Sequence, residues 1–307
     1  PQREPVALSE KLLLRLFVVF KAHADENGMV ARRQLALIAE SDEFAQFEQA
    51  TSELRVTRVE ELSDAGKIAF WLNVYALLTM HGYVVNASRL RDTLDIIGML
   101  RLHRRFCYEI GGFAFSAIQV EHSVLRGTLP RPTFIGTRLV IPKFSKDDPR
   151  CELAPKTAPS LLTFGLNPGI AHHSTVDLRA FGAKRLYADL HDCAANYLCH
   201  SVSLNLEPRT VTLPIQLLWH QADFGQTETA MLQAILPLLP AELTLTLQQW
   251  LTNRPHAFTV RYHSACWEVK YRVRSMEGSK PSSERQGIPD GQHACLHACI
   301  DTATVLM

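Results

Sequence analysis

The sequence lacks an excess of charge of either sign. Its 307 residues include 32 Lys and Arg against 31 Asp and Glu, which gives a net charge of +1. Proteins that bind nucleic acid or acidic lipid through phosphate groups carry a broad basic surface. We therefore expect no nucleic acid and no membrane surface as a partner, and instead an unidentified protein or small molecule.

Long hydrophobic runs and an ordered set of cysteines are also missing. The longest apolar run, Ile68 to Met80, is interrupted by Asn73 and is shorter than the roughly 20 helical residues that cross a bilayer. Seven cysteines without regular spacing do not resemble a secreted disulfide framework. No basic-then-apolar signal segment opens the chain, which begins at Pro1, so we expect the natural N-terminus to lie further upstream in a longer protein. These features predict a cytoplasmic protein.

Familiar cofactor motifs are absent. The sequence contains no Walker-type phosphate loop, dinucleotide fingerprint, zinc-protease motif or nucleophile elbow. Two stretches could still hold a metal, the adjacent His172 and His173 and the tract His293 to Cys299. A solvated segment is favoured for both, because adjacent imidazoles point apart and the tract lacks Cys-x-x-Cys units. We predict no metal and no cofactor.

What is present is a hydrophobic content of 47%, enough to bury a full core, arranged first at helical spacing. Leu8 to Ala22 carries one apolar stripe with Ser9 as a possible cap, and Arg32 to Glu61 continues the helical pattern with a break near Ser41. This predicts an N-terminal bundle. The run Lys67 to His81, with Ser63 before it and Gly82 beyond its end, predicts a central helix.

A hairpin follows the central helix. Tyr108 to Phe115 surrounds a Gly pair of the kind that a two-residue turn needs, and Ser116 with Gln119 predicts a capping box at the start of a helix to Arg126. The apolar run Ser160 to Leu166 predicts a buried strand that ends in the loop Asn167 to Gly169.

Shorter elements are predicted from there to the end of the ordered chain. They are a helix over Ala183 to Cys199, strands over Ser201 to Leu206 and Arg209 to Leu213, a helix from Pro214 to Trp219, helices near Thr229 to Leu239 and Leu243 to Leu251, and strands over Phe258 to His263 and Trp267 to Val273. The sequence thus predicts an α+β fold: a single mixed domain over 1–274, with an N-terminal helical bundle, a central helix, a hairpin and a small mixed sheet. Residues 275–307, rich in Ser, Pro, Gly and charge, predict a disordered tail.

Three motifs resemble a known family. They are the helical run Lys67 to Tyr75 followed by His81, the hairpin-to-helix run Ile110 to Arg126, and the later set Leu217, Trp219, Asp223, Phe224 and Gly225. Together they resemble the Domain of Unknown Function 547 family, with the similarity extending over roughly Leu8 to Val273. The resemblance implies a module of a larger protein, as in plant, protist and animal members, or a stand-alone bacterial protein.

This chain departs from the family pattern at two reactive positions. The family often has His-Phe-Ala-Leu-Asn-Cys-Gly where this chain has Thr163 to Gly169, so Thr163 replaces a His and Pro168 a Cys. A Cys and a His side by side would suit a thiol nucleophile with its base. The first hypothesis is therefore a non-catalytic or weakly active binding or regulatory module. The alternative is a thiol-dependent hydrolase or transferase that uses Cys107 or Cys151 instead.

The resemblance also indicates candidate site residues. Glu121 and His122 are the candidate catalytic pair, with His122 as a general base near neutral pH. The cleft around them would be lined by Asn73, Tyr75, His81, Ser116, Arg126, Asn167 and Gly169. The competing interpretation is structural: Glu121 and His122 belong to a buried polar network that fastens the hairpin to the central helix through Asn73, Tyr75 and His81.

Overall fold

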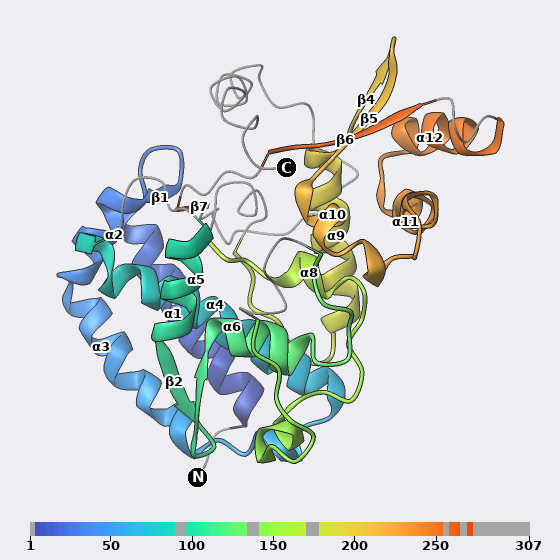
Figure 1. Cartoon of the computed structure of the whole chain (residues 1–307). Coiled ribbons are helices and arrows are strands. Elements are labelled where there is room, and N and C mark those ends of the chain that lie inside the picture. The colour runs from blue at the N-terminus through green and yellow to red at the C-terminus, as the bar shows by residue number, and fades with distance from the viewer. Residues whose placement is uncertain are drawn as a thin grey trace.

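The computed structural model describes residues 4–89, 96–133, 141–169, 178–253, 258–264 and 269–272. Helices dominate the described part, with small sheets at its edges (Figure 1). This confirms the predicted α+β class.

The N-terminal bundle is formed by helices α1 (Pro5–His23), α2 (Arg32–Ala39) and α3 (Asp42–Thr51), followed by the short helices η1 (Ser52–Val56) and η2 (Val59–Glu61). Glu4, not Ser9, caps α1, because its carboxylate accepts hydrogen bonds from the backbone of Val6 and Ala7. Ser9 lies buried inside the helix, where its hydroxyl donates to the carbonyl of Val6. The predicted cap is therefore wrong, although the helix is confirmed.

The central helix α4 (Asp64–Val85) is longer than predicted. Ser63 caps its start as expected, accepting a hydrogen bond from the Gly66 N–H. Gly82 does not end it but lies inside it, where an added Cβ would meet the Phe106 ring at 3.3 Å. A glycine here thus serves close packing rather than a helix stop.

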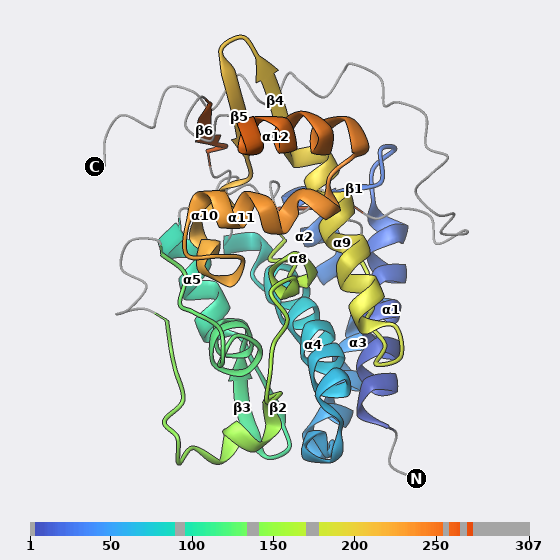
Figure 2. The ribbon, with the colours of Figure 1, turned by 90° about the vertical axis from the view of Figure 1, so that its right-hand side faces the viewer.

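All sides of α4 are covered by other elements, α1 most extensively (Figure 2). At 22 residues it is long and apolar enough to span a bilayer, but 94% of its most apolar window is buried within the fold. Burial on every side is the property of a core helix.

The hairpin is confirmed as β2 (Cys107–Ile110) and β3 (Phe113–Ser116), preceded by η3 (Ala87–Arg89) and α5 (Ile96–Arg105). Its turn uses positive φ at Gly111 and Gly112. The helix that follows begins as α6 (Ala117–Gln119) and widens into the π-helical turn η4 (Val120–Leu125). The sequence predicted a helix here but not its change of pitch.

The described part of the connection after η4 is fixed to the central helix around η5 (Pro149–Leu153). Lys67 Nζ donates to the carbonyl of Glu152 over 2.5 Å, and Trp71 Nε1 donates to that of Leu153 over 2.8 Å. The segment around η5 therefore packs against the N-terminal half of α4.

The predicted strand over Ser160 to Leu166 is wrong. The segment forms the short helix α8 (Leu162–Gly165), packed against α9 (Leu186–Ser201). A short buried apolar run satisfies either structure, because burial removes the alternation that would distinguish a strand from a helix.

The remaining elements build a mixed three-stranded sheet and a helical cover. β4 (Ser203–Leu206) pairs antiparallel with β5 (Arg209–Leu213), which pairs parallel with β6 (Thr259–Tyr262), so the predicted small mixed sheet is confirmed. The β4–β5 hairpin projects from the body (Figures 1 and 2). The intervening elements are α10 (Ile215–Trp219), η6 (Gln221–Asp223), α11 (Glu228–Ile235), η7 (Leu236–Leu238) and α12 (Ala241–Asn253).

A strand near each end of the described chain completes the fold. β1 (Met29–Ala31), which the sequence did not predict, pairs antiparallel with β7 (Lys270–Arg272). The pairing buries Tyr271 against the ring of Phe20, at 5.4 Å between centroids, and near Tyr83 of α4. The predicted tail, 275–307, lies outside the described residues.

Candidate functional site

The candidate pair lies where the central helix meets the π-helical turn. Tyr75 of α4 donates its hydroxyl hydrogen to Glu121 Oε2 over 2.9 Å, and Glu121 Oε1 lies 3.6 Å from His122 Nε2. The structure therefore brings Glu121 and His122 together with Tyr75, and the His122 side chain is only 7% exposed.

The π-helical turn helps to gather these residues on one element. The Arg126 N–H donates to the Glu121 carbonyl five residues earlier over 2.8 Å, closing a wider turn than an α-helix would. Such single wide turns occur preferentially at functional sites. Nothing in the hydrophobic pattern of this segment distinguishes the wide turn from a regular helix, which is why it was not predicted.

Burial and the neighbouring charges leave both candidate residues deprotonated near neutral pH. Burial alone would raise the pKa of Glu121, but attraction to His122, the hydrogen bond from Tyr75 and the charge of Arg126 outweigh it and lower that pKa. Burial lowers the pKa of His122, Glu121 opposes this, and the positive charges of Arg126 and Arg131 lower it further. The carboxylate is thus ionised and the imidazole neutral, the form that accepts a proton.

His103 of α5 is a neighbour that the sequence analysis did not identify. Its Nε2 lies 3.2 Å from the Tyr83 hydroxyl, and its ring packs edge-on against Tyr75 at 6.3 Å. Burial lowers the pKa of His103 to about 4. Glu121 raises this pKa and His122 lowers it, and both effects are smaller than that of burial. His103 is therefore a buried neighbour of Tyr75.

Arg126 is held by a carboxylate from a distant element. Its Nη2 donates to Asp223 Oδ1 over 3.0 Å, and its Nη1 lies 2.7 Å from Oδ2, with the side chains 2% and 1% exposed. Asp223 is therefore the carboxylate that pairs with the Arg126 guanidinium. Both Arg126 and Asp223 were present in the motifs, but their separation in sequence gave no sign that they pair.

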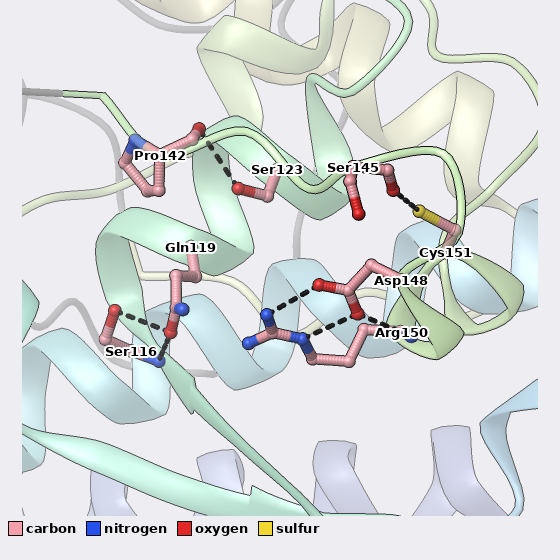
Figure 3. A network of polar contacts seen from close by, with 8 residues as sticks. All are labelled: Ser116, Gln119, Ser123, Pro142, Ser145, Asp148, Arg150 and Cys151. Atoms are coloured by element: carbon pink, nitrogen blue, oxygen red, sulfur yellow. Dashed lines mark hydrogen bonds and ion pairs between the residues drawn. The ribbon is translucent and has the colours of Figure 1, made fainter. Parts of the chain in front are cut away.

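A pocket opens beside His122 and Arg126. The other residues that line it are Leu129, Pro130, Arg131, Pro132, Ile141, Pro142 and Lys143, and its empty volume, counted to the open mouth, is about 260 Å³. Arg126 Nη2 fixes one wall by donating to the Pro130 carbonyl over 3.2 Å. Ser123 fixes the opposite wall by donating to the Pro142 carbonyl over 3.1 Å (Figure 3). Both walls are thus attached to the element that carries His122.

Two residues that line this pocket have a buried nitrogen without a hydrogen-bond partner within the described structure, His122 at Nδ1 and Arg126 at Nε. The other ring nitrogen of His122, Nε2, faces Glu121. Leaving a buried polar atom without a partner costs about 1–3 kcal/mol. Such an atom at a pocket is a feature of sites that are completed by a ligand.

Two of the predicted cleft residues, Asn73 and His81, form contacts away from the pair. Asn73 faces away from the pair, donating to Ser9 Oγ and to the Phe181 carbonyl and accepting from the Phe181 N–H. His81 lies between Tyr108 of the hairpin and Glu48 of α3, 2.9 Å from each. The structural interpretation, in which the hairpin is fastened to the central helix, thus holds for His81 and not for Asn73.

Ser116 forms half of the predicted capping box. Gln119 Oε1 accepts hydrogen bonds from the Ser116 N–H over 3.0 Å and from its hydroxyl over 3.1 Å (Figure 3). The Ser116 hydroxyl therefore donates to the Gln119 side chain, so it is an end-of-helix contact and not part of the pocket lining.

The loop Asn167 to Gly169 follows a helix, not the predicted central strand, and it contacts α4 one turn beyond Tyr75. Thr79 Oγ1 donates to the Asn167 carbonyl over 3.4 Å, and Asn167 Oδ1 accepts from the Gly169 N–H. Residues four apart lie on the same face of an α-helix, so the loop approaches the side of α4 that carries Tyr75. His172 and His173 lie outside the described residues.

The two candidate thiols of Cys107 and Cys151 have hydrogen-bond partners away from the candidate pair. Cys107 and Cys151 are exposed, and their thiols donate to backbone carbonyls of neighbouring residues (Figure 3 shows Cys151). Burial raises the pKa of Cys107, the opposite of what activates a thiol. Cys193 is buried in α9.

Metal ligation has no support in the part of the chain that the structure describes. No group of three or more His, Cys, Asp or Glu side chains there could hold an ion. The tract His293 to Cys299 falls outside it.

Comparisons with known proteins relate part of the chain to a family. Searches among curated proteins and among solved structures gave no match. The family model described as "Protein of unknown function, DUF547" matches residues 59–198, a narrower range than the motifs suggested, and this range contains the central helix, the hairpin, the Glu121–His122 pair and the pocket. Residues 59–198, somewhat under half of the chain, are therefore similar to the DUF547 family.

Proposed function

We propose that this domain is a binding module, part of a larger protein, that holds a small molecule or the end of a partner chain in the pocket beside His122, without a cysteine nucleophile. The observation that carries the proposal is His122 Nδ1, buried at the pocket without a partner. A ligand that hydrogen-bonds this atom would remove the cost of leaving it unsatisfied.

The arrangement around His122 favours binding over covalent chemistry. Thr163 and Pro168 supply neither the imidazole nor the thiol found at these positions in many family members. Cys107 and Cys151 donate to backbone carbonyls instead of facing an imidazole. A thiol enzyme needs an activated thiolate beside its base.

Alkylation of the thiols under native conditions distinguishes the module from a thiol-dependent hydrolase or transferase. With iodoacetamide and mass spectrometry of each cysteine, we expect the exposed Cys107, Cys151 and Cys199 to react in the folded chain without one of them standing out as fast, and the buried Cys193 to react only after unfolding. One thiol that reacts fast below pH 7, and loses this reactivity in His122→Gln, would show the enzyme instead.

Ligand-dependent melting tests binding itself. A panel of small acids, amines, sugars and nucleotides is screened for compounds that raise the melting temperature of the native chain. We expect at least one to do so with His122 intact and to lose most of its effect in His122→Gln. The matched control is His191→Gln, an exposed histidine of α9, which should behave as the native chain does.

A further inference from the structure

The lining of the pocket is positively charged. It includes Arg126, Arg131 and Lys143 beside His122, and no Asp or Glu among its described residues. The charge of Arg126 is balanced from behind by Asp223, whereas Lys143 lies exposed. A ligand therefore meets the positive charge of Lys143 at the mouth.

We infer that this pocket binds a small oxyanion, a carboxylate or phosphate group, and that His122 takes up a proton at Nδ1 when the anion binds. The inference rests on the proposed binding function and names the ligand class and the chemistry of recognition.

The proton uptake follows from which ring nitrogen faces which neighbour. Nε2 faces the ionised Glu121 carboxylate, an acceptor, so the neutral ring keeps its hydrogen on Nε2 and presents a lone pair at Nδ1. An unprotonated oxygen of a carboxylate or phosphate group has only lone pairs to offer and repels that nitrogen. It can be bound there only after Nδ1 gains a hydrogen.

The charged groups around His122 make the two events mutually dependent. Glu121 favours the protonated ring, whereas Arg126, Arg131 and the nearby His103 disfavour it when they are charged, and Lys143 adds positive charge at the mouth. An incoming anion cancels part of the positive field. Protonation of His122 then becomes favourable, and protonation in turn strengthens anion binding.

Pocket size and rigidity limit the ligand to a compact group. The pocket is open to solvent and its enclosed part is small, with room for little more than a water-sized group, so only one compact end of a ligand can enter it. The hydrogen bonds from Ser123 and Arg126 hold the two walls before any ligand arrives, so binding need not order them.

Calorimetric titration with sodium acetate across pH 6–8 tests the inference, at constant ionic strength set with chloride. Acetate stays ionised over this range, since carboxyl pKa values lie near about 4. We expect the apparent Kd to fall as pH falls, by up to about tenfold per pH unit, because one proton accompanies each anion. Buffers of different ionisation enthalpy should report uptake of up to one proton per acetate.

Two variants and a control separate the contributions of His122 and Lys143 to acetate binding. His122→Gln keeps a hydrogen-bond donor but cannot titrate, so acetate binding should become nearly independent of pH. Lys143 is exposed, so Lys143→Met leaves the core intact. This variant should weaken acetate binding severalfold at every pH without changing how the affinity depends on pH. His191→Gln should match the native chain in both respects.

Inorganic phosphate at pH 7 provides the second arm. Tighter binding of phosphate than acetate would assign a phosphate group, and the reverse a carboxylate. The inference is overturned if neither anion binds, or if binding has the same pH dependence with and without His122. A neutral compound that needs His122 would overturn it while leaving the proposed function intact, whereas a fast thiol would overturn the proposed function and leave proton-linked anion binding standing.

Discussion

Single residues in this fold are fixed by close contacts that the sequence alone does not reveal. Gly169 has φ +72°, and a Cβ placed there would lie 2.1 Å from the Tyr271 hydroxyl oxygen. Gly112 has φ +81° with no atom within 4 Å of such a Cβ. The two glycines share a left-handed backbone conformation, and they differ in the free space around the position of an added Cβ.

That difference predicts unequal effects of alanine. Gly112→Ala should cost about 1–2 kcal/mol of unfolding free energy from backbone strain alone. Gly169→Ala should cost at least about 3 kcal/mol, because the clash with buried Tyr271 adds to the same strain. Urea unfolding measures both, and equal losses would mean that Tyr271 does not lie against Gly169.

His103 predicts a loss of stability in acid. Its folded-state pKa of about 4 is below the unfolded value of about 6.5, so as the pH falls through this interval the unfolded chain gains a proton that the folded chain excludes. Stability is unaffected by this group above pH 6.5 and is reduced by about 3 kcal/mol near pH 4.

The measurement is urea unfolding of the native chain and His103→Gln at several pH values between 4 and 7. The variant should lose less stability across this interval than the native chain does. Parallel curves for the two proteins would contradict the burial of a neutral imidazole, and His191→Gln provides the exposed reference.

At the scale of elements, local patterns in the sequence predict individual helices and hairpins. Contacts between segments that are distant in the sequence are not predicted. The central helix and the β2–β3 hairpin were predictable because apolar spacing and a Gly pair specify them locally. Helix α8 was mistaken for a strand because a short buried run has no periodicity of its own. In the site, Glu121, His122 and Arg126 were predicted from motifs, but the role of Asp223 depends on a contact between η4 and η6 that no local pattern encodes.

The Arg126–Asp223 pair predicts a strong energetic coupling between η4 and η6. Asp223→Ala should cost about 3–5 kcal/mol, because it leaves the buried guanidinium without its counter-charge. The double variant Arg126→Met, Asp223→Ala should be destabilised by less than the sum of its two single variants, because it leaves no unpaired buried charge. A double-mutant cycle by urea unfolding measures this, and simple additivity would contradict the buried pair.

At the scale of the whole molecule, the boundary of the folded domain is the feature to test. A chain ending at Arg274 retains β7 with Val269 and Tyr271, so it should keep the cooperative melting transition of the full chain. A chain ending at Ser264 lacks both buried side chains and should melt at lower temperature or without cooperativity. Loss of the transition in the longer truncation would place part of the fold within 275–307.

Pairing of β1 with β7 also affects how the protein is made. The strand that covers Phe20 and Tyr83 is supplied by one of the last described segments of the chain, so a nascent chain on the ribosome exposes that aromatic surface until nearly all of the domain has emerged. Contacts between distant segments form late, and exposed apolar surface promotes aggregation in the meantime. Synthesis of this domain should therefore depend on chaperones that shield its N-terminal helices, and chains stopped before Tyr271 should be recognised as misfolded and degraded.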